Sequence, residues 1–102
     1  MDINALMRQA QSMQRNMQKK QKEVEAKEFV VSSNGGAIVI TIKGDKTVLK
    51  IDIDEDLLDK DNKEMFQEML VIAMNEAITK VEEEMSSAMN GATGGMNIPG
   101  MF

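Results

Sequence analysis

The chain has 102 residues, a net charge of −5 at neutral pH, and neither cysteine nor histidine. The lack of cysteine excludes disulfides and thiolate ligands, and the lack of histidine removes the commonest general base and metal ligand. The N-terminal residues lack a secretory pattern, and no apolar run approaches the ~18 residues that span a bilayer. We therefore expect one soluble, cytoplasmic domain over residues 1–89, followed by a flexible Gly- and Met-rich tail over residues 90–102.

Residues 3–26 are predicted to form a helix with a narrow apolar stripe. The stripe repeats at steps of three and four residues, the heptad pattern of paired helices. Its members are Ile3, Leu6, Ala10, Met13, Met17 and Val24. Lys20 occupies the remaining position of this seam. Because an isolated helix with so narrow a stripe is marginal, it needs a second helix, from this chain or from another copy.

Three strands are predicted next, over Glu28–Ser33, Ala37–Lys43 and Thr47–Asp54. The segments Asn34-Gly35-Gly36 and Gly44-Asp45-Lys46 between them are typical of hairpin turns. Alternation places one set of apolar residues on a single face of the sheet: Ile38, Ile40, Ile42, Leu49, Ile51 and Ile53. Val48 is expected on the other face. The apolar face of this antiparallel meander needs a cover.

The last regular element expected is a second helix over about Asn62–Met89. Asp61 is the expected N-cap, with Glu64 as its capping-box partner. The apolar face of this helix is wide enough to contact the sheet and one further surface; it contains Met65, Phe66, Met69, Leu70, Ala73, Ala77, Val81 and Met85. The predicted fold is therefore α+β, in the order α-β-β-β-α. Dimerisation is an economical way to cover the apolar surface that remains.

The polar residues are not predicted to form a catalytic or metal site. Asp52, Asp54 and Asp56 have the spacing of the first ligands of a calcium loop, but Leu57 and Lys63 stand where that loop needs glycine and a bidentate glutamate. The serines have no histidine to activate them, and no apolar pocket is indicated that would tune a carboxylate for acid–base work. We expect no enzymatic activity, no cofactor, no metal and no small-molecule substrate.

The first helix carries a charge of nearly one sign. Its basic residues are Arg8, Arg15, Lys19, Lys20 and Lys22. Arg8, Arg15 and Lys22 recur every seven residues, on a line that we place beside the apolar seam. Residues 1–22 have a net charge of +4, whereas the rest of the chain has −9. Solubility and contact with a phosphate backbone explain such a face equally well, and from this feature alone both interpretations stay open.

Several short motifs follow one another along nearly the whole chain. In order they are Leu6-Met7-Arg8-Gln9-Ala10-Gln11, Met13-Gln14, Met17-Gln18-Lys19, Gly35-Gly36, Ile53-Asp54, Leu57-Leu58, Asn75-Glu76-Ala77 and Ile98-Pro99-Gly100. Their order resembles the YbaB/EbfC family of nucleoid-associated proteins, which are small bacterial DNA-binding homodimers. The order of the motifs, rather than any one of them, carries the resemblance.

The resemblance implies a tweezer-like homodimer whose helices project as prongs, with DNA held between or along them. It also implies low sequence preference and a role in nucleoid organisation and gene regulation. Arg8 and Lys19 match basic positions of the family's first helix, and the DNA-binding residues that we expect are Arg8, Arg15, Lys19, Lys20 and Lys22. The residues that we expect in the dimer interface are Leu6, Ala10, Met13, Met17, Phe66 and Leu70.

A protein-interaction module is the alternative function. In that interpretation the Met-rich helix faces and the apolar tail contact a protein partner, such as one acting in DNA recombination or repair. The acidic remainder of the chain would then repel DNA at physiological salt. The two functions differ in whether the purified protein binds duplex DNA.

Overall fold

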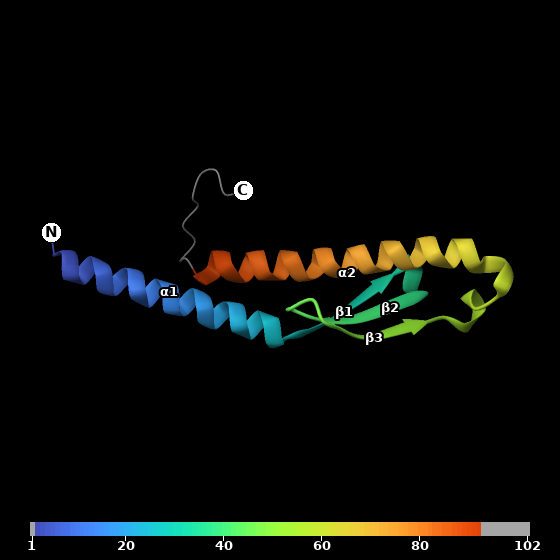
Figure 1. The fold of residues 1–102 in the computed structure, drawn as a ribbon, viewed down its shortest axis with the longest axis horizontal. Coiled ribbons are helices and arrows are strands. Elements are labelled where there is room, and N and C mark those ends of the chain that lie inside the picture. Colours follow the sequence, from blue (N-terminus) through green and yellow to red (C-terminus); the bar gives the residue numbers. More distant parts are fainter. Residues whose placement is uncertain (1, 93–102) are drawn as a thin grey trace.

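The computed structural model describes residues 2–92 and has the predicted α-β-β-β-α order (Figure 1). The helices are α1 (Ile3–Ala26) and α2 (Lys63–Ala92), and the strands are β1 (Glu28–Ser33), β2 (Ile38–Lys43) and β3 (Val48–Ile53). The 3-10 turns are η1 (Asn34–Gly36), η2 (Glu55–Leu57) and η3 (Lys60–Asn62). The predicted fold class is confirmed, and each strand boundary differs from the prediction by at most one residue.

The three strands form one antiparallel sheet in the order β1-β2-β3. In the turn between β1 and β2, Asn34, Gly35 and Gly36 have φ values of 54°, 68° and 93°. These left-handed conformations suit glycine and asparagine, as the predicted hairpin requires. Phe29 of β1 lies opposite Ile42 of β2, so the two side chains share one face of the sheet.

β3 does not alternate regularly, contrary to the prediction. Thr41 pairs with Lys50, whereas the next residue of β2, Ile42, pairs with Val48. β3 therefore has one extra residue, Leu49, at a bulge. Because opposite residues share a face, Val48 lies on the same side of the sheet as Ile42, and the prediction that it lies on the other face is wrong.

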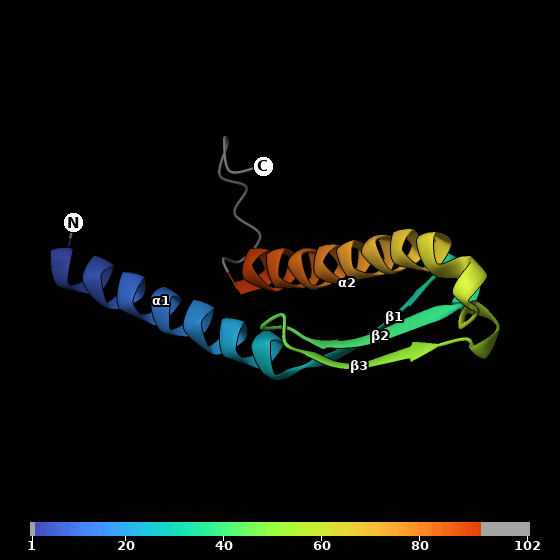
Figure 2. The same ribbon diagram turned by 45° about the vertical axis from the view of Figure 1, so that its right-hand side comes forward.

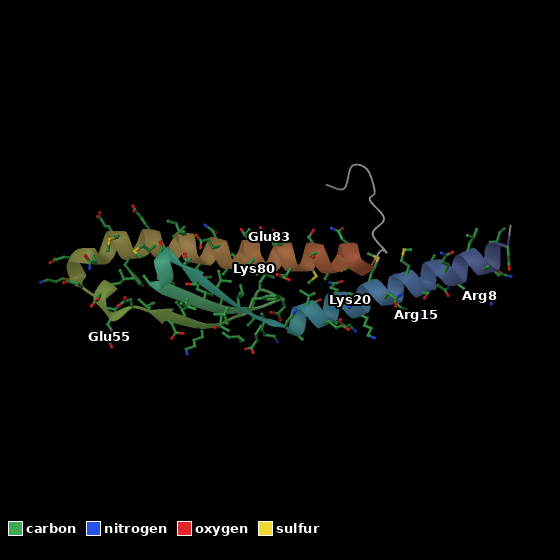
Figure 3. The ribbon with its side chains drawn as sticks, turned by 180° about the vertical axis from the view of Figure 1, so that it is seen from behind. Arg8, Arg15, Lys20, Glu55, Lys80 and Glu83 are labelled. Atoms are coloured by element: carbon green, nitrogen blue, oxygen red, sulfur yellow. The ribbon has the colours of Figure 1, made fainter. Side chains whose placement is uncertain are left out.

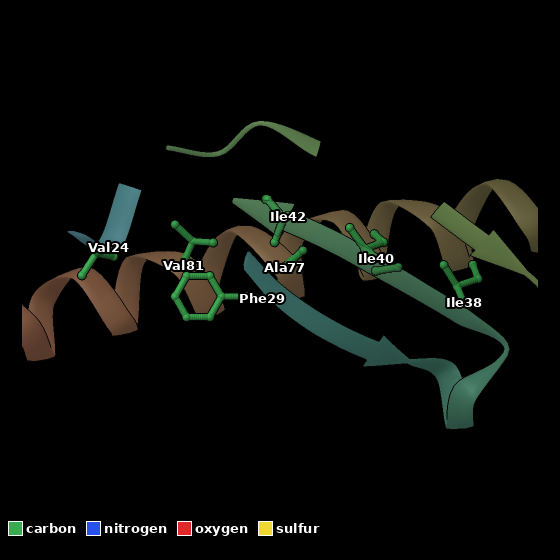
Figure 4. Close-up of a cluster of buried hydrophobic side chains, with 8 residues drawn as sticks. Val24, Phe29, Ile38, Ile40, Ile42, Ala77 and Val81 are labelled. Carbon is green, nitrogen blue, oxygen red and sulfur yellow. The ribbon is translucent and has the colours of Figure 1, made fainter. Parts of the chain in front are cut away.

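The core lies between α2 and the first two strands (Figure 4). Its buried apolar residues are Val24, Phe29, Ile38, Ile40, Ile42, Ala73, Ala77 and Val81. The small side chains of Ala73 and Ala77 allow the backbone of α2 to approach the isoleucines of β2. Asn34 also joins the two layers, because its Nδ2 donates to the Met69 carbonyl oxygen at 3.0 Å and to Ser33 Oγ at 3.1 Å.

β3 is the exposed part of the apolar sheet face. α2 packs on β1 and β2 rather than on β3. Val48, Leu49 and Ile51 are consequently 36%, 47% and 39% exposed in the single chain. The prediction that Ile51 lies on the same face as the β2 isoleucines agrees with the register, in which Ile51 lies opposite Ile40, but α2 does not extend its cover over Leu49 and Ile51 within residues 2–92.

α2 starts within one residue of the prediction, but the cap before it and its C-terminal end differ. The helix starts at Lys63, and the side chain that caps the turn leading into it is that of Asp59, which accepts from the Asp61 backbone nitrogen at 3.0 Å. The sequence predicts Asp61 as the cap, but Asp61 lies within the 3-10 turn η3, whose own cap is Asp59. α2 continues to Ala92 rather than Met89, so the predicted tail begins within the helix and its residues 93–102 lie outside the described part.

The molecule is elongated because α1 extends beyond the end of α2, as the views in Figures 1 and 2 agree in showing. Its extents are 71, 26 and 16 Å, and its radius of gyration is 19.3 Å. A compact domain of this length has a radius of gyration of about 13 Å. Within residues 2–92, neither helix is apolar enough over a sufficient length to cross a bilayer.

Candidate nucleic-acid interface

α1 carries all the predicted DNA-binding residues, and local interactions define its two ends. At the start, the Asp2 side chain accepts a hydrogen bond from the Asn4 backbone nitrogen at 3.1 Å, which satisfies an amide that has no partner within the helix. At the other end, Lys27 is extended and its N–H donates to the Val24 carbonyl oxygen at 3.0 Å. The helix predicted over residues 3–26 is confirmed.

The apolar seam and most of the basic residues lie on opposite faces of α1. Val24 is buried and Met13 and Met17 are half-buried, so the seam is the face that packs within the protomer. At 3.6 residues per turn, Arg8 and Arg15, seven residues apart, point about 180° away from the centre of that seam. The prediction that they lie beside the seam is therefore wrong, because these heptad positions face away from the packing partner.

Lys20 differs from the other basic residues of α1. It lies on the seam side, and its Nζ is 3.5 Å from Glu23 Oε2. The remaining basic residues of this helix form no ion pair with any residue in the described part of the chain; they are Arg8, Arg15, Lys19 and Lys22. All four are exposed. The structure thus separates the five predicted residues into four unpaired cations on one face and a fifth that is paired on another.

The unpaired cations extend from the free part of the helix to the segment that lies beside the end of α2. Figure 3 shows Arg8 and Arg15 on the part of α1 beyond the end of α2, and Lys20 close to that end. At 1.5 Å per residue, Arg8 and Lys22 are about 21 Å apart along the helix axis. That length equals about six base pairs of duplex at 3.4 Å each. The four cations, here called the basic line, form a surface that can follow a phosphate backbone.

The acidic residues lie mainly on the rest of the molecule. Part of their charge is paired, since Lys80 Nζ lies 2.8 Å from Glu84 Oε1 and Lys46 Nζ lies 3.7 Å from Glu82 Oε1. The hydrogen bond between Lys80 and Glu84 raises the pKa of the lysine and lowers the pKa of the carboxyl. Figure 3 shows Glu55 at the end of the molecule opposite to Arg8. Positive and negative charge are therefore separated along the long axis.

The aspartates of the acidic segments cap turns. Asp45, Asp54 and Asp59 each accept a hydrogen bond from the backbone nitrogen two residues later, at 2.9 to 3.0 Å. The bonds from Thr47 lower the pKa of Asp45. No group of acidic side chains among residues 2–92 is arranged to hold a metal ion. These carboxylates have a structural explanation that needs no ligand.

The residues predicted for a dimer interface fall into two groups. Leu6 and Ala10 are exposed on the free part of the seam. Met13, Met17, Phe66 and Leu70 are half-buried within the protomer, and Leu70 packs against the core. Sequence reasoning did not include the uncovered face of β3, because its exposure depends on where α2 crosses the sheet, which periodicity does not reveal.

Comparisons with known proteins agree with this arrangement. The model of the YbaB/EbfC DNA-binding family matches residues 1–96. A nucleoid-associated protein of Clostridium novyi is 48% identical over 102 residues, covering 100% of this chain and 90% of that protein. A second, of Clostridium acetobutylicum, is 44% identical over 100 residues, covering 98% and 89%. A crystal structure of an uncharacterized protein from Helicobacter pylori has the same fold, with a TM-score of 0.72 at 22% identity, covering 91% of this chain and 98% of that one.

Proposed function

Because the chain belongs to the YbaB/EbfC DNA-binding family, which is not a family of enzymes, we propose that it binds duplex DNA as a homodimer with low sequence preference. The basic line, whose Arg8 and Arg15 lie on the free part of α1, is the observation that carries this proposal. Its exposed cations release counterions when they contact phosphates, which favours binding. Phosphate contacts carry no direct sequence information, so the protein should accept unrelated duplexes.

The relatives from Clostridium novyi and Clostridium acetobutylicum are nucleoid-associated proteins by name. We extend that property to this chain as part of the proposal. The protein would act in the cytoplasm on the nucleoid, in its organisation and in gene regulation. Binding without strong sequence preference suits such a role, because a protein of this kind can bind at many positions over the whole chromosome.

The homodimer is supported by apolar surface that the protomer leaves open. On α1, Leu6 is 48% exposed although it belongs to the seam. On the sheet, Val48 and Ile51 lie on the side that α2 covers elsewhere, and they are 36% and 39% exposed. We propose that a second copy covers both regions, with the predicted interface residues of α1 and α2 contributing where they are still accessible. Dimerisation would double the basic line.

A second function is favoured by one observation. Met65, Val71 and Ile72 of α2 are 47%, 60% and 48% exposed. A contiguous exposed apolar surface is typical of a site that binds another protein. A protein-interaction module that assists recombination or repair proteins is therefore the alternative, and it requires no affinity for DNA.

The proposal is tested with two charge-reversal variants that change the net charge equally. In the first, Arg8→Glu and Arg15→Glu reverse two members of the basic line. In the matched control, Lys60→Glu and Lys63→Glu reverse two exposed cations at the opposite end of the molecule. Binding to several unrelated labelled duplexes is followed by fluorescence anisotropy between about 50 and 200 mM salt. Circular dichroism checks that each variant is folded.

We expect the first variant to lose binding and the control to retain it. Equal losses in both variants would mean that net charge, and not the basic line, decides affinity. If the unmodified protein fails to bind any duplex at the lowest salt, the DNA-binding proposal is refuted and the protein-interaction module takes its place.

A further inference from the structure

The turn between β2 and β3 touches the end of α1 at a single glycine. Gly44 is buried, and a Cβ atom built on it would overlap the carbonyl oxygen of Val24 and lie 2.5 Å from its carbonyl carbon. The next contact would be the Cα of Glu25 at 3.0 Å. All three are backbone atoms of α1, which cannot rotate aside as the end of a flexible side chain can. Only glycine fits between this turn and this helix as they now lie.

Hydrogen bonds hold the same junction together. The Gly44 backbone nitrogen donates to the Lys27 carbonyl oxygen at 2.9 Å. Lys27 in turn donates to the Val24 carbonyl oxygen, the atom nearest to the missing Cβ. The Val24 side chain is buried in the core, and Lys46 of the same turn pairs with Glu82 of α2. The last turn of α1 is thus fixed to the sheet and to α2 within a few residues.

The free part of α1 has no comparable support. Among residues 2–92 no other element lies beside it beyond the end of α2 (Figures 1 and 2), so its direction is determined at the junction with the sheet and where α1 packs on α2. Ile3 lies about 31 Å from Val24 along the helix, and a tilt of about 10° at the junction therefore moves the tip by about 5 Å. That movement exceeds the rise of about 3.4 Å between successive phosphates of one strand.

We propose that Gly44 is a positioning residue that sets the direction of α1 and thereby where the basic line meets DNA. The inference rests on the DNA-binding function proposed above. It adds that affinity depends on a residue that touches no DNA and lies in a different element. A side chain at position 44 would push the end of α1 away from the turn, leaving every cation in place on the helix but out of register with the phosphates.

The test compares Gly44→Ala with Gly91→Ala, the matched control, since a Cβ at Gly91 meets nothing within 4 Å. Because the chain contains no cysteine, Asn4→Cys and Glu76→Cys give two unique sites for spin labels, both exposed. Their separation is measured by pulsed electron paramagnetic resonance in protein diluted with unlabelled chains. DNA affinity and its salt dependence are measured by anisotropy on a labelled duplex.

We expect Gly44→Ala to change the label separation by up to about 5 Å, because a tilt of about 10° moves the tip of α1 by that amount and only the component along the line between the labels is measured. Both basic lines of a symmetric dimer would then be out of register with the phosphates, so the slope of log affinity against log salt should become shallower, to about half if half of the phosphate contacts are lost. Gly91→Ala should change neither quantity. A folded Gly44→Ala protein with an unchanged label separation, or with a shifted separation and unchanged DNA binding, would overturn the inference.

Two further measurements distinguish the possible outcomes. If Gly44→Ala does not fold, Gly-Gly is inserted between Ala26 and Lys27, which frees the direction of α1 without changing position 44. This insertion should make the slope of log affinity against log salt shallower in the same way, and an unchanged slope would refute the inference. Loss of binding in the Arg8→Glu and Arg15→Glu variant, with normal binding in Gly44→Ala, rejects the role of Gly44 and keeps the proposed function. Absence of binding by the unmodified protein rejects both.

Discussion

Replacing Arg15 by glutamine should change the salt dependence of DNA binding by an amount that follows from the structure. Arg15 is exposed, unpaired and on the free part of α1. The proposed dimer would have eight cations in its two basic lines; if each neutralises one phosphate, the slope of log affinity against log salt is about −7, and affinity falls about 10⁴-fold between 50 and 200 mM salt. Arg15→Gln removes two of these charges, so the slope should become shallower by about 1.8.

The assay is an anisotropy titration of one labelled duplex at several salt concentrations. Lys20→Gln is the informative comparison, because Lys20 lies on the seam side of α1 and pairs with Glu23. It removes the same charge per chain from a different face, and its slope should stay close to that of the unmodified protein. The assignment of the phosphate-contacting face would be refuted if Lys20→Gln changed the slope as much as Arg15→Gln, or if Arg15→Gln left it unchanged.

Three further predictions concern the fold and the dimer. Ile40→Ala truncates a fully buried core residue and should lower the free energy of unfolding by about 2–5 kcal/mol; urea unfolding with an unchanged midpoint would contradict the position of the core. Ile51→Glu should dissociate the dimer with little change in helix content, as measured by sedimentation, because this side chain is accessible in the protomer; a dimer of undiminished stability would exclude β3 from the interface. The lowered pKa values of Asp45 and Glu84 mean that both carboxylates stabilise the fold above their ordinary values of 3.8 and 4.5 and lose that contribution as the pH falls through the lower folded values. The melting temperature should therefore decrease below about pH 4, and less steeply in an Asp45→Asn and Glu84→Gln variant; equal profiles would disprove this origin of the acid sensitivity.

The fold was predictable because its signals are local. The step of three and four residues identified α1, and alternation with turn residues identified the strands. Lys27, which is extended, and Asn34, which is left-handed, lie where the hydrophobic pattern changes, at the end of α1 and at the end of β1. The basic residues were found in the same way, since an uninterrupted run of one charge is visible without any tertiary information.

What could not be predicted depends on contacts between distant segments. The side on which Val48 lies follows from a bulge opposite Ile42, which alternation cannot anticipate. The exposure of Leu49 and Ile51 follows from the path of α2 over the other two strands. Gly44 resembled any other turn glycine, because its contact with Val24 joins residues twenty positions apart in the sequence.

The separation of charge along the molecule makes it a large electric dipole. Residues 1–22 hold a net charge of +4 at one end, and the remaining −9 belongs to the rest of the chain. In the field of a polyanion such a dipole turns before contact, so the tip of α1 approaches first and the acidic end points outward. Because the protein is oriented before it contacts DNA, a larger fraction of its encounters with DNA is productive. The association rate constant should therefore exceed that of an evenly charged molecule of the same net charge, and added salt should remove the difference by screening the charges.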